Sequence, residues 1–248
     1  MPDVNGYRVK FGNIIPSTNT TVERDFSAVY LPGVTYHTGR IHVGESKLNS
    51  AKDVEANIAS IGEEVAAAFR TTLTCKPDYM IMGMSAPTFW GGKAGAEAFG
   101  ERMAEHSDGL GITTGAVACR SALEALGVHS IAVLTPYLPI ADEQVVKFFE
   151  DYGYSVTRIR GLECTTMTAI AEVTEDQLRA EIKALDGPDI DAIVQVGTDL
   201  SMIRLADEAE RWLGKPVVAI NGATMWHALR ANGVKDQFSG FGALLREY

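Results

Sequence analysis

Short apolar runs alternate with longer amphipathic segments along almost the whole chain. The runs have the length and composition of buried strands, whereas the segments between them repeat their apolar residues with the 3.6-residue period of a helix. The expected strands are Val9–Ile15, Tyr79–Met84, Ile112–Thr114, Ser130–Thr135, Ser155–Ile159, Ala192–Val196 and Pro216–Asn221. The expected helices are Lys52–Leu73, Ala94–His106, Val117–Leu126, Ile140–Tyr152, Glu175–Leu185, Ser201–Leu213 and Ala223–Asn232.

This alternation predicts an α/β protein assembled from βαβ units, in which helices cover both faces of parallel sheets. Several expected helices end in a glycine-containing stop, as in LEALGVHS, EDYGYS and RWLGKP. The length of 248 residues suits one large domain or two lobes of about a hundred residues each.

Two stretches of the chain share one layout. Asp78 to Met84 and Asp191 to Gly197 each begin with an acidic residue, continue as an apolar strand and reach a turn six positions later. Ligands of open α/β sheets bind beyond the carboxyl ends of strands. The two stretches therefore predict two similar lobes, related by a pseudo-two-fold axis, with the active site in the cleft between them. The alternative is that any two buried strands followed by turns look alike. The expected first lobe comprises residues 1–115 and 222–248, and the second comprises residues 116–221.

Composition narrows the classes of function. The net charge of −10 argues against a nucleic-acid or anionic-membrane partner, but a small anionic substrate stays open because local donors decide its binding. No apolar run approaches the roughly 20 residues of a membrane span, and MPDVNGYRVKFG at the N-terminus lacks a signal-peptide pattern. The three widely spaced cysteines form neither a zinc motif nor a disulfide framework, so a cytoplasmic location is expected. Phosphate-loop and dinucleotide motifs are missing from the sequence, and neither a metal nor an organic cofactor is expected.

The first expected strand runs directly into a polar stretch, Ile15-Pro16-Ser17-Thr18-Asn19-Thr20-Thr21-Val22-Glu23. At a helix start, free backbone N–H groups and side chains such as those of Ser17 and Asn19 can donate hydrogen bonds to a carboxylate. An ordinary helix cap is the alternative, but five polar residues in a row exceed what capping needs. The stretch therefore predicts a carboxylate-binding turn.

Three further stretches lie where an expected strand ends. They are Gly83-Met84-Ser85-Ala86-Pro87-Thr88-Phe89-Trp90-Gly91-Gly92, Val133-Leu134-Thr135-Pro136-Tyr137 and Val196-Gly197-Thr198-Asp199-Leu200. Together with the polar stretch they resemble the maleate isomerase and arylmalonate decarboxylase branch of the aspartate/glutamate racemase superfamily. The resemblance continues through Gly214-Lys215-Pro216 to Phe241-Gly242-Ala243-Leu244-Leu245 and covers nearly the whole chain.

The resemblance implies roles for most of the site residues, and Asp199 is added by its position in the sequence. The expected catalytic residues are Ser85, Tyr137, Thr198 and Asp199. Of these, the first two would supply hydroxyl donors and the third its backbone N–H to an oxyanion. The expected substrate-binding residues are Ser17, Asn19, Met84, Gly197 and Asn221. Met84 and Gly197 fall on the two positions at which the family places catalytic cysteines.

Neither replacement can do the work of a cysteine. A thioether carries no proton and glycine offers only backbone, so the usual two-thiol racemase or isomerase mechanism is disfavoured. Asp199, two residues beyond Gly197, is the best-placed acid, and capping of the following helix is its alternative role. A buried structural thiol is the expected role of the native cysteines, Cys75, Cys119 and Cys164.

These inferences predict a cofactor-independent lyase or isomerase that converts a small carboxylate through an oxyanion or enediolate intermediate, as a decarboxylase does. One alternative is a cis–trans isomerase of the maleate isomerase type with an atypical catalytic residue, for which Cys75 or Cys164 would supply the thiol. The other is a carboxylate-binding protein without catalysis. A small carboxylate is the expected partner, and the apolar helix Ala94–Met103 is compatible with a homo-oligomer.

Overall fold

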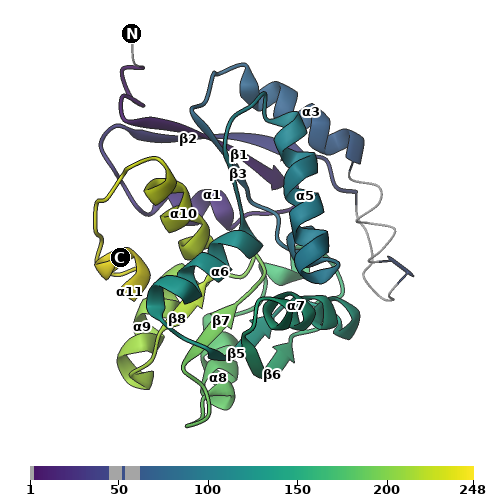
Figure 1. The fold of residues 1–248 in the computed structure, drawn as a ribbon, viewed down its shortest axis with the longest axis vertical. Helices are drawn as coiled ribbons and strands as arrows, with labels where there is room; N and C mark the ends of the chain where they lie inside the picture. Colours follow the sequence, from purple (N-terminus) through teal and green to yellow (C-terminus); the bar gives the residue numbers. More distant parts are fainter. Residues whose placement is uncertain (1–2, 45–51, 54–61) are drawn as a thin grey trace.

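The computed structural model describes residues 3–44, 52–53 and 62–248. Two four-stranded parallel sheets occupy its upper and lower halves in Figure 1. The first has the order β2-β1-β3-β4, formed by β1 (Val9–Pro16), β2 (Val34–Ile41), β3 (Tyr79–Met82) and β4 (Ile112–Thr114). The second has the order β6-β5-β7-β8, formed by β5 (Ser130–Thr135), β6 (Ser155–Gly161), β7 (Ala192–Gln195) and β8 (Val217–Ala219). The predicted α/β class with two similar parallel sheets is confirmed.

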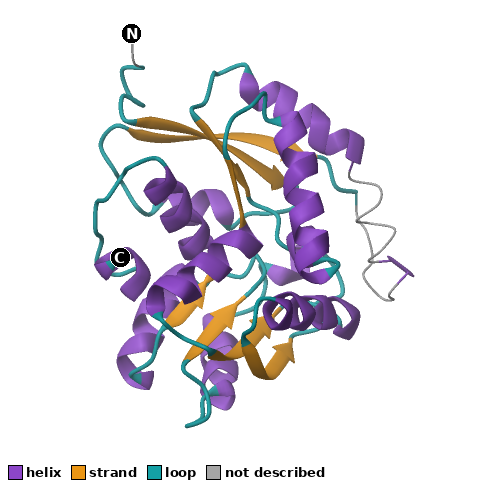
Figure 2. Cartoon of the chain, in the orientation of Figure 1, coloured by secondary structure: helices purple, strands orange, loops and turns teal. Residues whose placement is uncertain are grey.

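Helices flank both sheets (Figure 2). They are α1 (Val22–Ser27), α3 (Gly62–Leu73), α4 (Ala86–Phe89), α5 (Gly92–His106), α6 (Gly115–Leu126), α7 (Pro139–Asp151), α8 (Glu175–Leu185), α9 (Ile203–Leu213), α10 (Ile220–Ala231) and α11 (Ala243–Glu247), with a 3₁₀ turn η1 at Thr168–Ile170. The predicted glycine stops are confirmed at α6 and α9. Gly127 and Gly214 end these helices with φ of 67° and 68°, a left-handed conformation that glycine adopts without steric cost.

The apolar core joins the two sheets. Phe11 of β1 and Val133 of β5 belong to one buried cluster together with residues of α6 and α10, and Figure 1 shows these two helices between the sheets. Separate clusters lie on the outer faces, where Met80 packs with α3 and α5 and Ile193 packs with α8 and α9. The predicted division into residues 1–115 with 222–248 and residues 116–221 stays a prediction.

The repeated layout that begins at Asp78 and Asp191 has a structural counterpart. Strands β3 and β7, which follow these residues, hold the same place in their sheets. Asp78 Oδ2 accepts the N–H of Lys10 at the start of β1 at 2.8 Å, and Asp191 Oδ2 accepts the N–H of Ser130 at the start of β5 at 2.8 Å. Each carboxylate therefore ties its strand to the central strand beside it.

Some element boundaries differ from those predicted. The strand β2 was missed because its middle, Thr35 to Thr38, is polar and only partly buried, as an edge strand allows. The strand expected to end at Met84 ends at Met82, and the strand expected to reach Asn221 ends at Ala219, so Asn221 lies in the first turn of α10. The first helix was expected over residues 52–73, of which 54–61 lie outside the described residues.

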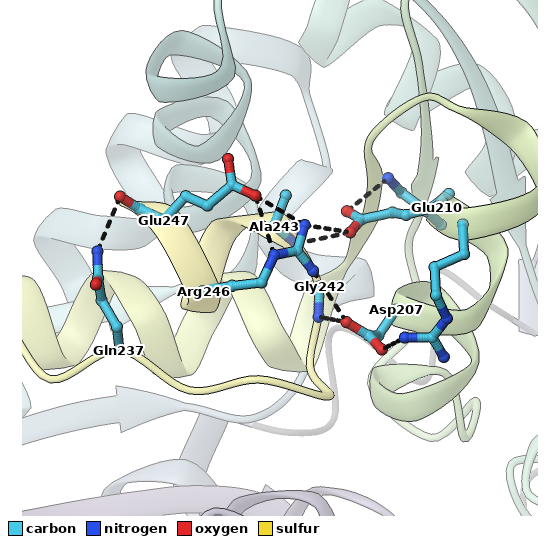
Figure 3. Close-up of polar contacts among 9 residues, drawn as sticks. Asp207, Glu210, Gln237, Gly242, Ala243, Arg246 and Glu247 are labelled. Carbon is cyan, nitrogen blue, oxygen red and sulfur yellow. Dashed lines mark hydrogen bonds and ion pairs between the residues drawn. The ribbon is translucent and has the colours of Figure 1, made fainter.

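A carboxylate pair on α9 holds the C-terminal helix (Figure 3). Asp207 accepts the N–H of Gly242 at 3.2 Å and Glu210 accepts that of Ala243 at 2.7 Å, so the start of α11 is capped from outside. Arg246 reaches back from α11 and donates to Asp207 at 3.2 Å. None of the helices formed by described residues combines the length and the apolarity needed to cross a bilayer.

Candidate active site

A cavity of about 80 Å³ lies where the carboxyl ends of β1, β3, β5 and β7 meet between the sheets. The turns after these central strands supply most of its wall, as expected for open α/β sheets. Its lining residues are Pro16, Thr18, Asn19, Met84, Ser85, Ala86, Pro87, Pro136, Tyr137, Leu138, Ala141, Cys164, Met167, Ile170, Gly197, Thr198 and Asp199.

Three donors converge on one part of the cavity wall. Ser85 Oγ lies 2.6 Å from Tyr137 Oη, and the backbone N–H of Thr198 donates to Ser85 Oγ at 3.2 Å. The bond between the two hydroxyls uses one of their two protons, whichever oxygen is the donor. Since Thr198 donates rather than accepts, the second hydroxyl proton is left for a ligand. The cluster can therefore donate to an oxyanion in either arrangement.

Tyr137 is held as a neutral donor. Burial raises the pKa of its hydroxyl above the ordinary value, so the phenol stays protonated at neutral pH. Its backbone N–H donates to Thr135 Oγ1 at 3.1 Å, and the Thr135 hydroxyl donates in turn to the carboxylate of Asp142 on α7. This chain of bonds fixes the turn that carries Tyr137.

Gly197 has no room for a side chain. Its φ of +114° is a conformation that residues with a Cβ rarely adopt. A Cβ placed there would lie 2.5 Å from Cδ and 2.6 Å from Cγ of Pro136. The proline and the backbone conformation together explain why glycine occupies this position.

Asn19 and Asp199 connect the two halves of the cavity. Asn19 Oδ1 accepts the N–H of Thr21 and of Val22, both at 3.0 Å, and its Nδ2 donates to Thr198 Oγ1 at 3.4 Å. Asp199 Oδ1 accepts the N–H of Thr20 at 3.0 Å and of Thr21 at 3.2 Å. The alternative in which Asp199 caps the helix after it was wrong, because its carboxylate binds the turn before α1 across the cleft, and α9 begins at Ile203 without a side-chain cap. Burial raises the pKa of Asp199, and the N–H donors oppose that shift.

Ser17 and Asn221 are the expected site residues that do not line the cavity. Ser17 is exposed, and its Oγ accepts the N–H of Val43 at 3.0 Å. Asn221 is buried behind the cavity wall, where its Nδ2 donates to Asp25 Oδ2 and to the carbonyl of Thr198, both at 2.9 Å. Neither side chain is aimed at a ligand in the cavity, and their substrate-binding roles stay predictions.

Part of the cavity lining is apolar. Besides Met84, this apolar wall is formed by Ala86, Pro87, Leu138, Ala141, Met167 and Ile170. Met167 and Ile170 come from the segment around η1 after β6, which carries no motif. Among the described residues that line the cavity there is no lysine, arginine or histidine, so the donors that these residues offer to a bound anion are neutral. In the described part of the chain, no three His, Cys, Asp or Glu side chains gather closely enough to hold a metal ion.

Cys164 is the cysteine that lines the cavity. Its backbone N–H donates to the carbonyl of Pro136 at 3.0 Å, beside the turn that carries Tyr137. Burial raises the pKa of its thiol, so the thiol is protonated at neutral pH. Cys75 Sγ contacts the carbonyl of Thr72 at the far end of the first sheet, and Cys119 is fully buried in α6.

Comparison with known proteins relates this chain and its fold to two enzyme types. The family model described as arylmalonate decarboxylase matches residues 11–245. The arylmalonate decarboxylase of Bordetella bronchiseptica is 33% identical over 170 residues, which cover 67% of this chain and 70% of that protein. The maleate isomerase of Nocardia farcinica is 25% identical over 247 residues, covering 96% of each protein.

A solved structure extends the likeness to three dimensions. A cysteine-to-serine mutant of Nocardia farcinica maleate cis-trans isomerase, with a covalently bound succinylcysteine intermediate, superposes with a TM-score of 0.86. That comparison covers 97% of this chain and 99% of the isomerase at 24% identity. At this identity the match shows a common fold.

Proposed function

This chain belongs to the arylmalonate decarboxylase family, and on that premise we propose that it is a cofactor-independent decarboxylase of malonates that carry one apolar substituent. The substrate loses one carboxylate as carbon dioxide, and the electron pair of the broken C–C bond passes into an enediolate on the remaining carboxylate. A proton then enters the α-carbon. In the overall change, the malonate dianion and one proton give a monocarboxylate and carbon dioxide.

The donor cluster is the observation that carries this proposal. The charge that develops on the enediolate needs donors that are in place before the reaction. Ser85 and Tyr137 share one hydrogen bond and keep one hydroxyl proton for the ligand, and Thr198 orients the pair through its backbone N–H. Because these donors are neutral, they stabilise the negative charge that is spread over the two oxygens of the enediolate. They do not hold the carboxylate of the substrate as strongly as the charged guanidinium of an arginine would.

The apolar wall supports the choice of decarboxylation. Met167, Ile170 and Leu138 offer a departing carboxylate no hydrogen bonds, so that carboxylate gains by becoming neutral carbon dioxide. The same wall suits an aryl or alkyl substituent.

Met84 and Gly197 form the cavity wall in the positions that the resemblance gives to cysteines, and neither supplies a proton. Asp199 accepts two N–H groups of the turn before α1, and these oppose the rise in the pKa of its carboxyl that burial causes. The groups that can supply the proton are therefore the carboxyl of Asp199, the protonated thiol of Cys164 and water in the cavity.

A second candidate is cis–trans isomerisation of a maleate-like substrate. The observation in its favour is that Cys164 places a thiol in the cavity wall, while the Nocardia isomerase carries its intermediate on a cysteine. The raised pKa of the Cys164 thiol counts against a ready thiolate nucleophile.

One assay separates the candidates. Phenylmalonate, an alkylmalonate and maleate are each incubated with the protein in deuterated buffer and followed by NMR. Decarboxylation yields phenylacetate with deuterium at the α-carbon, whereas isomerisation yields fumarate from maleate. We expect phenylmalonate to be consumed by wild type, and a slower turnover in Cys164→Ser would identify the thiol as the source of the proton. Fumarate formed by wild type and abolished in Cys164→Ser would replace the first candidate with the second, and inertness of all three substrates would refute both.

A further inference from the structure

The peptide between Gly197 and Thr198 must keep one orientation if its N–H is to serve the cavity. Gly197 has the widest choice of backbone conformations of any residue type, and its φ of +114° lies where few residues are found. A glycine peptide beside a cavity therefore needs contacts that hold it. The most direct contact comes from Gln195, at the end of the preceding strand β7.

Gln195 ends β7, a strand whose other residues, Ala192, Ile193 and Val194, are apolar and fully buried. Its side chain is 1% exposed, so leaving its amide without a hydrogen-bond partner would lower the stability of the fold. The partner is the carbonyl of Gly197, which accepts from Gln195 Nε2 at 2.7 Å.

A trans peptide places its C=O and its N–H on opposite sides. Holding the Gly197 carbonyl toward Gln195 therefore turns the N–H of Thr198 the other way, where Ser85 Oγ accepts it at 3.2 Å. The next peptide is held in the same manner, because Asn221 Nδ2 donates to the carbonyl of Thr198 at 2.9 Å. Two side-chain amides thus hold two successive carbonyls away from the cavity.

We propose that Gln195 is a positioning residue, which fixes the Gly197–Thr198 peptide so that the Thr198 N–H faces Ser85 and the cavity. Its contribution is partial, since the N–H of Leu200 also donates to the Gly197 carbonyl, at 3.2 Å. A bond donated to the carbonyl also polarises the N–H of the same peptide and strengthens it as a donor. That this N–H helps to bind an oxyanion, by orienting Ser85, rests on the proposed function, but the orientation of the peptide does not.

The test uses Gln195→Met, which keeps the length and loses the donor, with exposed Gln177→Met on α8 as the matched control. The Thr198 amide is observed in the full chain by ¹⁵N-threonine NMR and assigned with Thr198→Ser. We expect Gln195→Met to shift this resonance and to speed its hydrogen exchange about tenfold, the effect of losing one hydrogen bond. Gln177→Met should leave both unchanged.

Gln195→Glu provides a second readout and carries the test if Gln195→Met does not fold. A protonated glutamic acid can donate to the Gly197 carbonyl and its carboxylate cannot, so the Thr198 resonance should return toward the wild-type position as the pH falls. A side chain that only filled space would change the melting temperature and produce no such titration. An unshifted Thr198 amide in Gln195→Met, or no titration in folded Gln195→Glu, would overturn the proposal.

Ligand affinity completes the experiment. Phenylacetate, the product expected from phenylmalonate, should bind Gln195→Met about tenfold more weakly than wild type, as loss of one oriented donor predicts. If Gln195→Met bound phenylacetate as tightly as wild type although its Thr198 amide resonance was shifted, ligand binding would not depend on the orientation of the Thr198 N–H. That part of the proposal would then be refuted. If phenylacetate bound neither protein, the proposed function would fail, and the orientation of the peptide would still be decided by the amide resonance.

Discussion

Replacing Gly197 by cysteine tests whether the glycine is required by its surroundings. The substitution returns a thiol to a position where the family resemblance expects one. The structure opposes it twice, through a φ of +114° and through Pro136, whose Cδ would lie 2.5 Å from the new Cβ. Real Cβ contacts that short do not occur, so the backbone or the proline must move.

The cost can be worked from these two effects. Holding a residue with a side chain in a sparsely populated backbone region costs about 1–3 kcal/mol. Forcing extra atoms into a packed site costs about 1–3 kcal/mol. Replacing glycine also restricts the unfolded chain, which stabilises the folded state by about 0.4–1 kcal/mol and offsets part of these costs. A net loss of about 3 kcal/mol in the free energy of unfolding follows, which lowers the melting temperature by about 6–12 °C in a chain of this size.

The assay is urea and thermal unfolding under reducing conditions, with Gly100→Cys as the control. Gly100 lies within α5 and a Cβ there meets no atom within 4 Å, so the control should not lose stability. Pro136→Ala in the Gly197→Cys background should recover the packing share of the loss and leave the backbone share. Wild-type stability of Gly197→Cys, or no recovery with Pro136→Ala, would refute the reasoning.

Three further substitutions test the stability of the fold. Asn13→Leu should raise the free energy of unfolding by about 1–2 kcal/mol, because both amide atoms of the fully buried Asn13 lack a partner among the described residues; a lower urea midpoint would contradict this. Burial raises the pKa of Asp25 to about 6, so the folded chain keeps a proton that the unfolded chain loses above its ordinary value of 3.8. Wild type therefore loses stability as the pH rises from about 4 to 6, whereas Asp25→Asn does not. Between about pH 4 and pH 7, the stability of Asp25→Asn relative to wild type, measured by thermal melting, should rise by about 2 kcal/mol. The same stability difference at both pH values would exclude the shift in the pKa of Asp25. Arg246→Ala should cost about 1–2 kcal/mol by removing a partner of the buried Asp207, whereas Lys147→Ala, which breaks an exposed pair, should cost under about 0.5 kcal/mol. Equal unfolding midpoints for these two variants would contradict the structural role of the C-terminal network.

Periodicity was enough to predict the fold class because most strands are continuous apolar runs between amphipathic helices. Strand β2 was not predicted because an edge strand has a neighbouring strand on one side only and can be less buried, and Thr35 to Thr38 show no apolar run. Helix α1 was not among the expected helices, and the start of α10 was predicted at Ala223 instead of Ile220. Asn19, rather than a residue at the helix boundary, satisfies N–H groups at the start of α1, and α10 follows β8 without a loop.

The candidate site was predicted where a motif follows a strand. Met84, Ser85, Tyr137 and Thr198 come from such turns, and all line the cavity. The apolar residues Met167 and Ile170 were not predicted, since they come from an irregular segment after β6 that carries no motif. The bond from Asp199 to Thr20 joins residues 179 positions apart, which local patterns do not reveal.

Gln195 could have been found from the sequence. A lone amide between Val194 and Val196 interrupts an apolar strand, and a buried polar side chain requires a partner. The partner, the carbonyl of Gly197, is only two residues away.

The most direct test of the central claim is a double-mutant cycle on the paired hydroxyls, measured as kcat/KM for phenylmalonate. Ser85→Ala and Tyr137→Phe should each lose about 100-fold, the usual effect of removing one preorganised oxyanion donor, and the double variant should lose little more because the pair acts as a unit. Tyr154→Phe, whose hydroxyl bonds the carbonyl of Arg120 away from the cavity, should retain wild-type activity. Activity of Tyr137→Phe within about threefold of Tyr154→Phe, a difference of well under 1 kcal/mol, would contradict the account.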